Sequence, residues 1–242
     1  MKKNLLKKHP VLGKILIAIA ALTWVGFVTI AAQFIVAYPM LWILGKDALF
    51  DNFWVTVYSA LVYIVSAFLV IVFPRFIKKT WKSTRESLGL TELPTFTDIG
   101  LALLGFIATL IVSGFVLQIL QGLNLIDAAQ SQDVGYNNLM SGFDRAIAFI
   151  ALVVVTPFFE ELIFRGWLYR KLKGKIGAVV SAILVAILFG ALHGQWNVGV
   201  TVGIMSLVIC IEQELTGTIY AGILTHMIKN GVAFWLLYVI SA

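Results

Sequence analysis

The sequence has little charge and almost no cysteine. Asp, Glu, Lys and Arg make up 12% of its 242 residues, about half the fraction of an ordinary soluble domain. A single cysteine, Cys210, excludes an intramolecular disulfide and a thiolate metal cluster. Apolar residues make up most of the chain instead: 60% of the residues are hydrophobic, and the mean hydropathy is +0.97. This composition excludes an ordinary soluble enzyme.

Long apolar runs take the place of the missing charge. A helix that spans a bilayer needs roughly 20 mostly apolar residues, and the sequence predicts seven such helices. They are expected near residues 14–38, 53–74, 98–122, 145–165, 177–193, 196–212 and 217–240. We therefore predict an all-α, polytopic transmembrane helical bundle that forms one integral-membrane domain over residues 1–242. The basic start of the chain resembles a signal peptide, but the apolar run after it is too long for one that is cleaved.

Most of the basic residues lie in three clusters that alternate with acidic connectors along the chain. The clusters are Lys2, Lys3, Lys7, Lys8 and Lys14; Arg75, Lys78, Lys79, Lys82 and Arg85; and Arg170, Lys171, Lys173 and Lys175. Basic loops face the cytoplasm, so the N-terminus is predicted to be cytoplasmic and the C-terminus to lie outside, in a multi-pass protein of the cell membrane. The clusters also suit anionic lipid headgroups. Nucleic acid is not an expected partner, because no aromatic side chains interleave the basic ones.

Few strongly polar groups interrupt the spans, and most of them gather in three short motifs. These read "EELIFR" at 160–165, "FGALH" at 189–193 and "HMIKN" at 226–230. An ionisable residue inside a bilayer costs at least a few kcal/mol and usually marks function. The three motifs are therefore the candidate site.

Helical spacing predicts which side chains of these motifs act together. Residues four apart share a helix face, so Glu161 and Arg165 are expected to form an ion pair. Glu160 lies about 100° around the helix from Glu161 and is left free to face a cavity. By the same spacing His226 and Asn230 project together from the last helix, and Phe189 shares a face with His193.

The depth of the motifs brings Glu160 and His193 level with each other. The connector "KLKGKIG" joins the fourth and fifth spans, and the two residues lie at similar distances from it in sequence. In an antiparallel hairpin they are level to within roughly 3 Å. The helix that carries Glu160 is expected to continue as a basic tail into the cytoplasm, so the site is predicted to lie toward the cytoplasmic side.

A glutamate and a histidine that face each other suit hydrolysis by an activated water. A carboxylate in an apolar site can act as general base, so Glu160 could take a proton from a water that His193 helps to hold. His226 and Asn230 could donate hydrogen bonds to the resulting oxyanion, a contribution that is often the largest in acyl transfer. These parts describe peptide-bond hydrolysis inside a membrane.

Structural roles are the simpler interpretation for several of these residues. We expect Glu161 and Arg165 to orient the helix, and Phe189 to form packing or the wall of a substrate pocket. A single intramembrane histidine usually serves helix packing, but two of them near the level of Glu160 favour function. Lys229 has no assigned role. Glu212 and Glu214 are expected to be solvated in a short connector.

The three motifs together resemble the signatures of the CPBP intramembrane proteases, also called the Abi family. That family includes type II CAAX prenyl endopeptidases and bacteriocin-immunity proteins. Its pattern is Glu-Glu-x-x-x-Arg, Phe-x-x-x-His and His-x-x-x-Asn or Asp, and each position is filled in this sequence. The resemblance covers about residues 88–235, within a catalytic core at about 98–240, and the first two spans carry no family signature.

The resemblance implies a role for each matching residue. Glu160 would activate water beside His193, His226 and Asn230 would stabilise the oxyanion, and Glu161 with Arg165 and Phe189 would support them. The family was long described as metal-dependent, and zinc usually takes three protein ligands plus water. Glu160, His193 and His226 could supply those ligands. We nevertheless expect no cofactor and no metal, because HExxH is absent and asparagine is an unusual zinc ligand.

The function predicted from the sequence is an intramembrane endopeptidase that cleaves peptides or membrane proteins. We expect it to act from the cytoplasmic side of the bilayer. The alternative is a non-catalytic membrane scaffold or bacteriocin-immunity protein that retains the motifs as packing. A proton relay or transporter is less consistent with the sequence, since it has no inverted repeat.

Overall fold

The computed structural model describes residues 10–77, 84–128, 130 and 142–240. In this part of the chain every regular element is a helix, which confirms the predicted all-α bundle. Six helices are long and apolar enough to cross a membrane, and a shorter apolar one joins them. This agrees with a bundle of about seven spans. The basic residues at 2–8 and 78–82, which carry much of the orientation prediction, lie outside the described residues.

Apart from the longer stretches at 78–95 and 123–141, the spans follow one another with short connections. In chain order they are α2 (Pro10–Leu44); α3 (Asn52–Ala67), which continues as a π-helix (Phe68–Val72) into α4 (Pro74–Ile77); α5 (Phe96–Gly122); one continuous helix (Gly142–Ile176); α9 (Ala178–Ala191); α10 (Trp196–Thr216); and α11 (Tyr220–Trp235), which ends in a π-helix (Leu236–Ile240). Two short 3-10 helices, Lys46–Leu49 and Glu86–Leu88, lie in the connections.

The limits of two spans differ from those predicted. The first helix continues through Pro39 to Leu44, because a proline removes one hydrogen bond without always ending a helix. The fourth continues beyond 165 to Ile176, as the expected basic tail α8 (Arg170–Ile176). That tail ends at Gly177, whose φ of 85° favours glycine, so α9 can begin at once and run back along the bundle.

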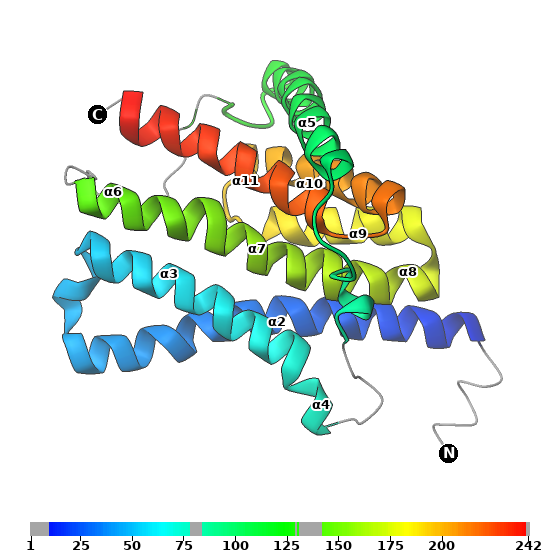
Figure 1. Cartoon of the computed structure of the whole chain (residues 1–242), viewed down its shortest axis with the longest axis horizontal. Coiled ribbons are helices and arrows are strands. Elements are labelled where there is room, and N and C mark those ends of the chain that lie inside the picture. The colour runs from blue at the N-terminus through cyan, green and yellow to red at the C-terminus, as the bar shows by residue number, and fades with distance from the viewer. Residues whose placement is uncertain (1–9, 78–83, 129, 131–141, 241–242) are drawn as a thin grey trace.

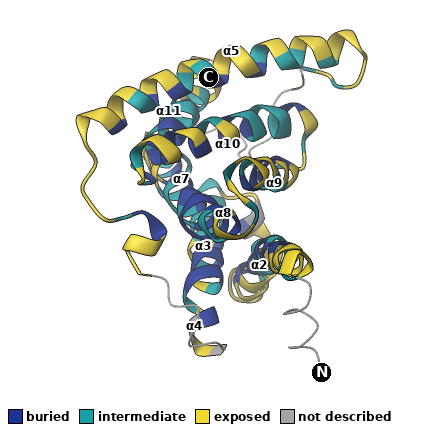
Figure 2. Ribbon diagram, turned by 90° about the vertical axis from the view of Figure 1, so that its right-hand side faces the viewer, coloured by how far each residue is buried: buried dark blue, intermediate teal, exposed yellow. Residues whose placement is uncertain are grey.

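The helix that carries the two glutamates lies in the middle of the molecule. Viewed nearly end-on, its segment α7 (Thr156–Glu161) is surrounded by the other helices, and the helix stays mostly buried as far as Leu172, whereas the end of α8 is exposed (Figure 2). By contrast, α2 and α5 lie at the periphery and are largely exposed, as expected for helices that face lipid. The apolar core includes Leu168, Tyr169, Phe189 and Met205.

The bundle has two distinct ends along its long axis (Figure 1). One end, which we call the α8 end, holds α8 and the start of α2. The opposite end, which we call the α6 end, holds the start of α6 (Gly142–Phe149), the α2–α3 connection and the C-terminal helix end. The basic cluster at 170–175 therefore lies at the α8 end.

Candidate active site

The Glu160–Glu161 pair lies in a short α-helical stretch between two π-helical segments of the same continuous helix. The flanking segments are Ile150–Val155 and Leu162–Tyr169. A π-helical turn holds an extra residue, which changes the side chains that face inward, and such turns are frequent at functional sites. Here the two adjacent glutamates are both buried, at 4% and 0% exposure.

Glu161 forms the ion pair that the helical spacing predicted. Arg165 Nη1 donates to Glu161 Oε1 over 3.0 Å, and both side chains are fully buried. The arginine also lies over the ring of Phe189, 4.8 Å from its centroid. Gln213 from α10 donates to the Arg165 backbone carbonyl over 3.4 Å. The pair therefore anchors the central helix to its neighbours.

His226 from α11 lies between the two carboxylates. Its Nδ1 is 2.9 Å from Glu161 Oε1, and its Nε2 is 3.5 Å from Glu160 Oε2. The imidazole therefore connects the Glu161–Arg165 pair to Glu160. Both ring nitrogens face carboxylates, and the longer contact to Glu160 is the weaker one.

Asn230 is held by a backbone group that the sequence leaves unpaired. The Thr156 N–H donates to the Ala151 carbonyl, and the next residue, Pro157, has no N–H to offer the Leu152 carbonyl. Asn230 Nδ2 donates to that carbonyl over 3.0 Å. The amide nitrogen of Asn230 is thus oriented toward the central helix, and its second N–H stays available to a ligand.

His193 lies in the turn just after α9, where the sequence predicted the end of the span, and the backbone of α9 orients it. Its Nδ1 lies 2.8 Å from the Phe189 carbonyl, one turn earlier. Because a carbonyl only accepts, Nδ1 carries a proton, and Nε2 of the neutral ring is an acceptor. The Phe189 ring packs against His193 and His226, with centroids 5.1 and 5.9 Å away. Phe189 is therefore both packing and part of the site wall.

The predicted site residues come together around one cavity of about 360 Å³. Glu160, His193, His226 and Asn230 all line it, and so does Phe189. The expected level arrangement of Glu160 and His193 agrees with this, although the residues share a cavity rather than a hydrogen bond. Glu161 and Arg165 lie behind the wall.

The cavity continues from this level toward the α6 end of the bundle. Its lining includes Leu152, which lies eight residues before Glu160 on the central helix. It also includes Phe234 and Tyr238, which lie eight and twelve residues beyond His226 on the last helix. Tyr238 is about 18 Å from His226 along the axis. The lining therefore extends away from the basic end, and it does not favour the predicted approach from the cytoplasmic side.

Two further residues of the cavity had no predicted role. Tyr63 on α3 forms a side-chain hydrogen bond with Glu160, and Lys229 on α11 is part of the lining. Tyr63 belongs to a span without a family signature, so only its phenol group in an apolar run could have singled it out. Lys229 could have been found, because it lies inside the third motif.

The interpretation of Glu212 as a solvated connector residue was wrong. It lies within α10, is 3% exposed, and accepts a 2.7 Å hydrogen bond from Thr225 of α11. The turn of the chain follows later, at Gly217, where φ is 73°. Glu214 is also helical and is half-exposed, and it accepts hydrogen bonds from Lys173 (2.6 Å) and Tyr169 (3.1 Å).

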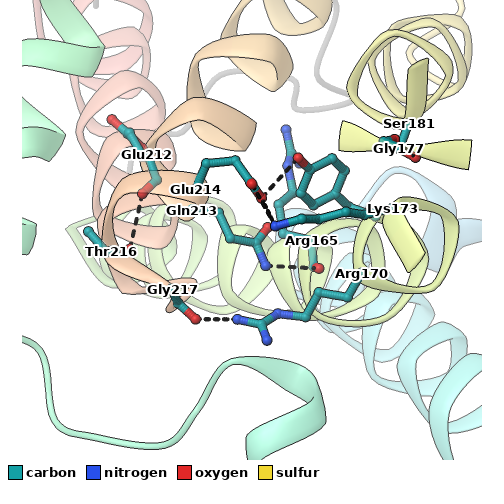
Figure 3. Close-up of polar contacts among 11 residues, drawn as sticks. Arg165, Arg170, Lys173, Gly177, Ser181, Glu212, Gln213, Glu214, Thr216 and Gly217 are labelled. Atoms are coloured by element: carbon teal, nitrogen blue, oxygen red, sulfur yellow. Dashed lines mark hydrogen bonds and ion pairs between the residues drawn. The ribbon is translucent and has the colours of Figure 1, made fainter. Parts of the chain in front are cut away.

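These contacts join α8 to the C-terminal end of α10. Figure 3 shows Lys173 reaching Glu214, Gln213 reaching the backbone of the central helix, and Arg170 reaching the Gly217 carbonyl. Part of the third basic cluster is therefore used in packing α8 against α10. This network fixes the central helix relative to the helices that bring Glu212 and His226.

A bound zinc ion would take Glu160, His193 and His226 as its protein ligands. Within the described residues, no group of three or more His, Cys, Asp and Glu side chains could hold a metal ion as they are arranged. In this arrangement His193 Nδ1 is used by the Phe189 carbonyl, and both His226 nitrogens face glutamates.

The site lies in the part of the chain that matches a known family. Residues 142–232 match the model of the type II CAAX prenyl endopeptidase Rce1-like family. No curated protein and no solved structure matches the chain. The matched segment contains all three motifs and ends beyond Asn230. The resemblance predicted from the motifs is thus confirmed for residues 142–232, which are similar to the Rce1-like family of type II CAAX prenyl endopeptidases.

Proposed function

We propose that this protein is an intramembrane endopeptidase in which Glu160 activates the attacking water. One observation carries the proposal: Glu160 of α7, His193 just after α9, and His226 and Asn230 of α11 line one cavity within a helical bundle. These side chains are buried or half-buried and hydrogen-bonded, as packing residues are, but they also line a cavity of about 360 Å³, which a packing role does not require and which can hold water and part of a peptide. The family match supports a CAAX-type endopeptidase in general.

The proposed reaction consumes one water and breaks one C–N bond. Glu160 takes a proton from a water that also donates to His193 Nε2, and the oxygen attacks the carbonyl carbon. Collapse of the tetrahedral intermediate breaks the C–N bond while Glu160 gives its proton to the leaving nitrogen. The products are a carboxylic acid and an amine.

Asn230 and His226 are proposed to stabilise the oxyanion. The second N–H of Asn230 is available, and its orientation is set before substrate binds. In this scheme His226 is an imidazolium, with Nδ1 donating to Glu161 and Nε2 able to donate to the oxyanion, because the contact of Nε2 with Glu160 is long at 3.5 Å. When Glu160 accepts the proton from water, that contact loses its charge, which favours donation from a protonated Nε2 to the oxyanion. Glu161 and Arg165 are positioning residues in this scheme.

The substrates we propose are peptides or membrane-protein segments within the bilayer. We also propose that residues 1–242 act as one domain, because α2 and α3, outside the core at 98–240, line the cavity with Thr29, Gln33 and Tyr63. The core therefore needs the first two spans for a complete wall.

The decisive test is a comparison of wild type with Glu160→Gln, which keeps the size of the side chain but removes the base. Membranes carrying either protein are compared by mass spectrometry for a protein that accumulates uncleaved, and purified enzyme is assayed on it. Turnover is expected to fall at least about 100-fold, with an unchanged melting profile. Glu92→Gln is the matched control, because Glu92 is exposed in a connection outside the cavity.

Normal turnover by Glu160→Gln would refute this mechanism. If no substrate accumulates while the protein still protects cells from a peptide toxin, the scaffold or immunity alternative holds.

Metal dependence is tested on the same substrate. We expect activity to survive exhaustive chelation, with far less than one zinc per chain by elemental analysis. Stoichiometric zinc with loss and rescue of turnover would replace the metal-free mechanism.

A further inference from the structure

Lys229 is a charged group of the cavity that the proposed reaction does not use. It lies on α11 between His226 and Asn230 in sequence, and its side chain is part of the cavity lining. Within the described residues it forms no hydrogen bond and no direct ion pair. Its side chain therefore borders the space that a substrate would occupy.

The protein supplies little to balance this charge. Glu160 is the acidic group that attracts Lys229, yet the two make no direct contact. The polar side chains that α2 and α3 add to the lining, such as Gln33, Ser59 and Tyr63, are neutral. An ammonium group that is largely removed from water is costly unless an anion pairs with it. A bound anion would therefore find a favourable position here.

We propose that Lys229 binds a carboxylate group of the peptide substrate, close to the bond that is cleaved. The inference rests on the proposed peptidase function, and it adds a preference for acidic substrates. A carboxylate is the anion that every unmodified peptide carries, either at its C-terminus or on Asp and Glu side chains. An extended peptide whose scissile carbonyl lies at Glu160 would be held at a second point.

The position of Lys229 relative to Glu160 limits how far the bound carboxylate can lie from the scissile bond. Lys229 is three residues beyond His226, about 4.5 Å along the helix, and His226 contacts Glu160 directly. An extended peptide advances about 3.3–3.6 Å per residue. The carboxylate should therefore lie within about three residues of the scissile bond.

Binding can be tested without turnover in the full-length Glu160→Gln protein. The probes are three pools of acetylated random tripeptides built from neutral residues: one with free C-terminal carboxylates, one amidated, and one amidated with a single Asp. We expect the free-acid or the Asp pool to raise the melting temperature in detergent and the neutral amidated pool not to. The pool that acts identifies a C-terminal or a side-chain carboxylate.

Variants at position 229 then assign the effect. Lys229→Met in the same background should abolish the difference between the pools, and Lys229→Arg should retain it. Lys46→Met is the control, because it removes a charge from an exposed connection, and it should leave the difference unchanged. Equal shifts by acid and neutral amide pools, or no shift by any pool, would overturn the proposal. These outcomes do not depend on whether Glu160 is the base.

Cleavage gives the second readout, on matched peptides with and without the carboxylate. In wild type, kcat/KM for the acidic peptide should exceed that for the neutral one by at least about 10-fold, and in Lys229→Met the ratio should approach one. If Lys229→Met instead lowers kcat equally for both peptides, the lysine acts on Glu160 or the oxyanion and the carboxylate site is refuted. Loss of cleavage in wild type alone, with the binding difference intact, would contradict the peptidase and not this site.

Discussion

His226 is the residue through which the ion pair behind the wall reaches the proposed base. Its Nδ1 is held by Glu161, which Arg165 holds in turn, and its Nε2 faces Glu160. A change at Glu161 should therefore act twice, on stability through the arginine and on activity through the imidazole. The effects on stability and on activity can be separated by a double variant that removes the charges of Glu161 and Arg165 together.

Glu161→Gln should lower the amount of folded protein. It leaves the fully buried Arg165 without its counter-ion, and breaking a buried pair typically costs about 3–5 kcal/mol. The double variant Glu161→Gln with Arg165→Met removes both charges and should recover much of the melting temperature. Its turnover should stay low, because Glu161 no longer fixes the imidazole through a charged hydrogen bond.

Thermal melting in detergent and turnover at equal folded concentration check both parts. Should Glu161→Gln be stable but inactive while Glu160→Gln turns over normally, the roles of the two glutamates are reversed. A double variant as unstable as the single one would instead show that the ion pair is not the source of the stability.

The residues that the sequence predicted correctly interact over short distances along the chain. Glu161 with Arg165, and Phe189 with His193, follow from helical spacing alone, and the structure confirms both contacts. Tyr63 reaches Glu160 from a helix almost a hundred residues earlier, and no periodicity connects them. Such contacts depend on how helices pack, which local pattern does not determine.

At the scale of helices, the packing of α5 against α10 and α11 depends on one glycine. Gly105 packs against the Glu212 carboxylate and Thr225, so that a Cβ at this position would overlap the carboxylate. Thr225 also donates to the Ala102 carbonyl of α5 over 3.3 Å. The small residue lets α5 approach the hydrogen bond between α10 and α11.

Gly105→Ala should therefore destabilise the protein, by about 1–3 kcal/mol as for other overpacked sites. Glu212 would have to move from its hydrogen bond with Thr225. Gly114→Ala is the matched control, because it lies on the same helix with open space at its Cβ position. That change should be neutral or stabilising by up to about 1 kcal/mol, as measured by denaturation in detergent.

Equal melting temperatures for the two variants would contradict the close packing at Gly105. The same contact explains why Glu212 was misread in the sequence. A glutamate near a predicted turn is usually solvated, and only the position of Gly217 and the approach of α5 bury it. The limits of the spans are uncertain from sequence for the same reason, since helix ends depend on caps and partners.

At the scale of the whole molecule, the remaining prediction is its orientation in the bilayer. The alternating basic clusters predict that the α8 end faces the cytoplasm. A cysteine or tag inserted after Lys175 should be accessible only from the cytoplasm, and one beside Gln130 only from outside. Membrane-impermeant labelling of intact and permeabilised cells measures both. Labelling beside Gln130 only after permeabilisation would overturn the predicted orientation.

The off-centre position of the cavity has a practical consequence if that orientation holds. Its lining extends from Glu160 toward Tyr238 at the α6 end, which would then be the outer leaflet. An inhibitor would not have to cross the cell membrane, and charged compounds that cells normally exclude become usable. A hydrophilic carboxylate-bearing peptide mimic, supplied in the medium, would then be a reasonable first lead against the proposed activity in living cells.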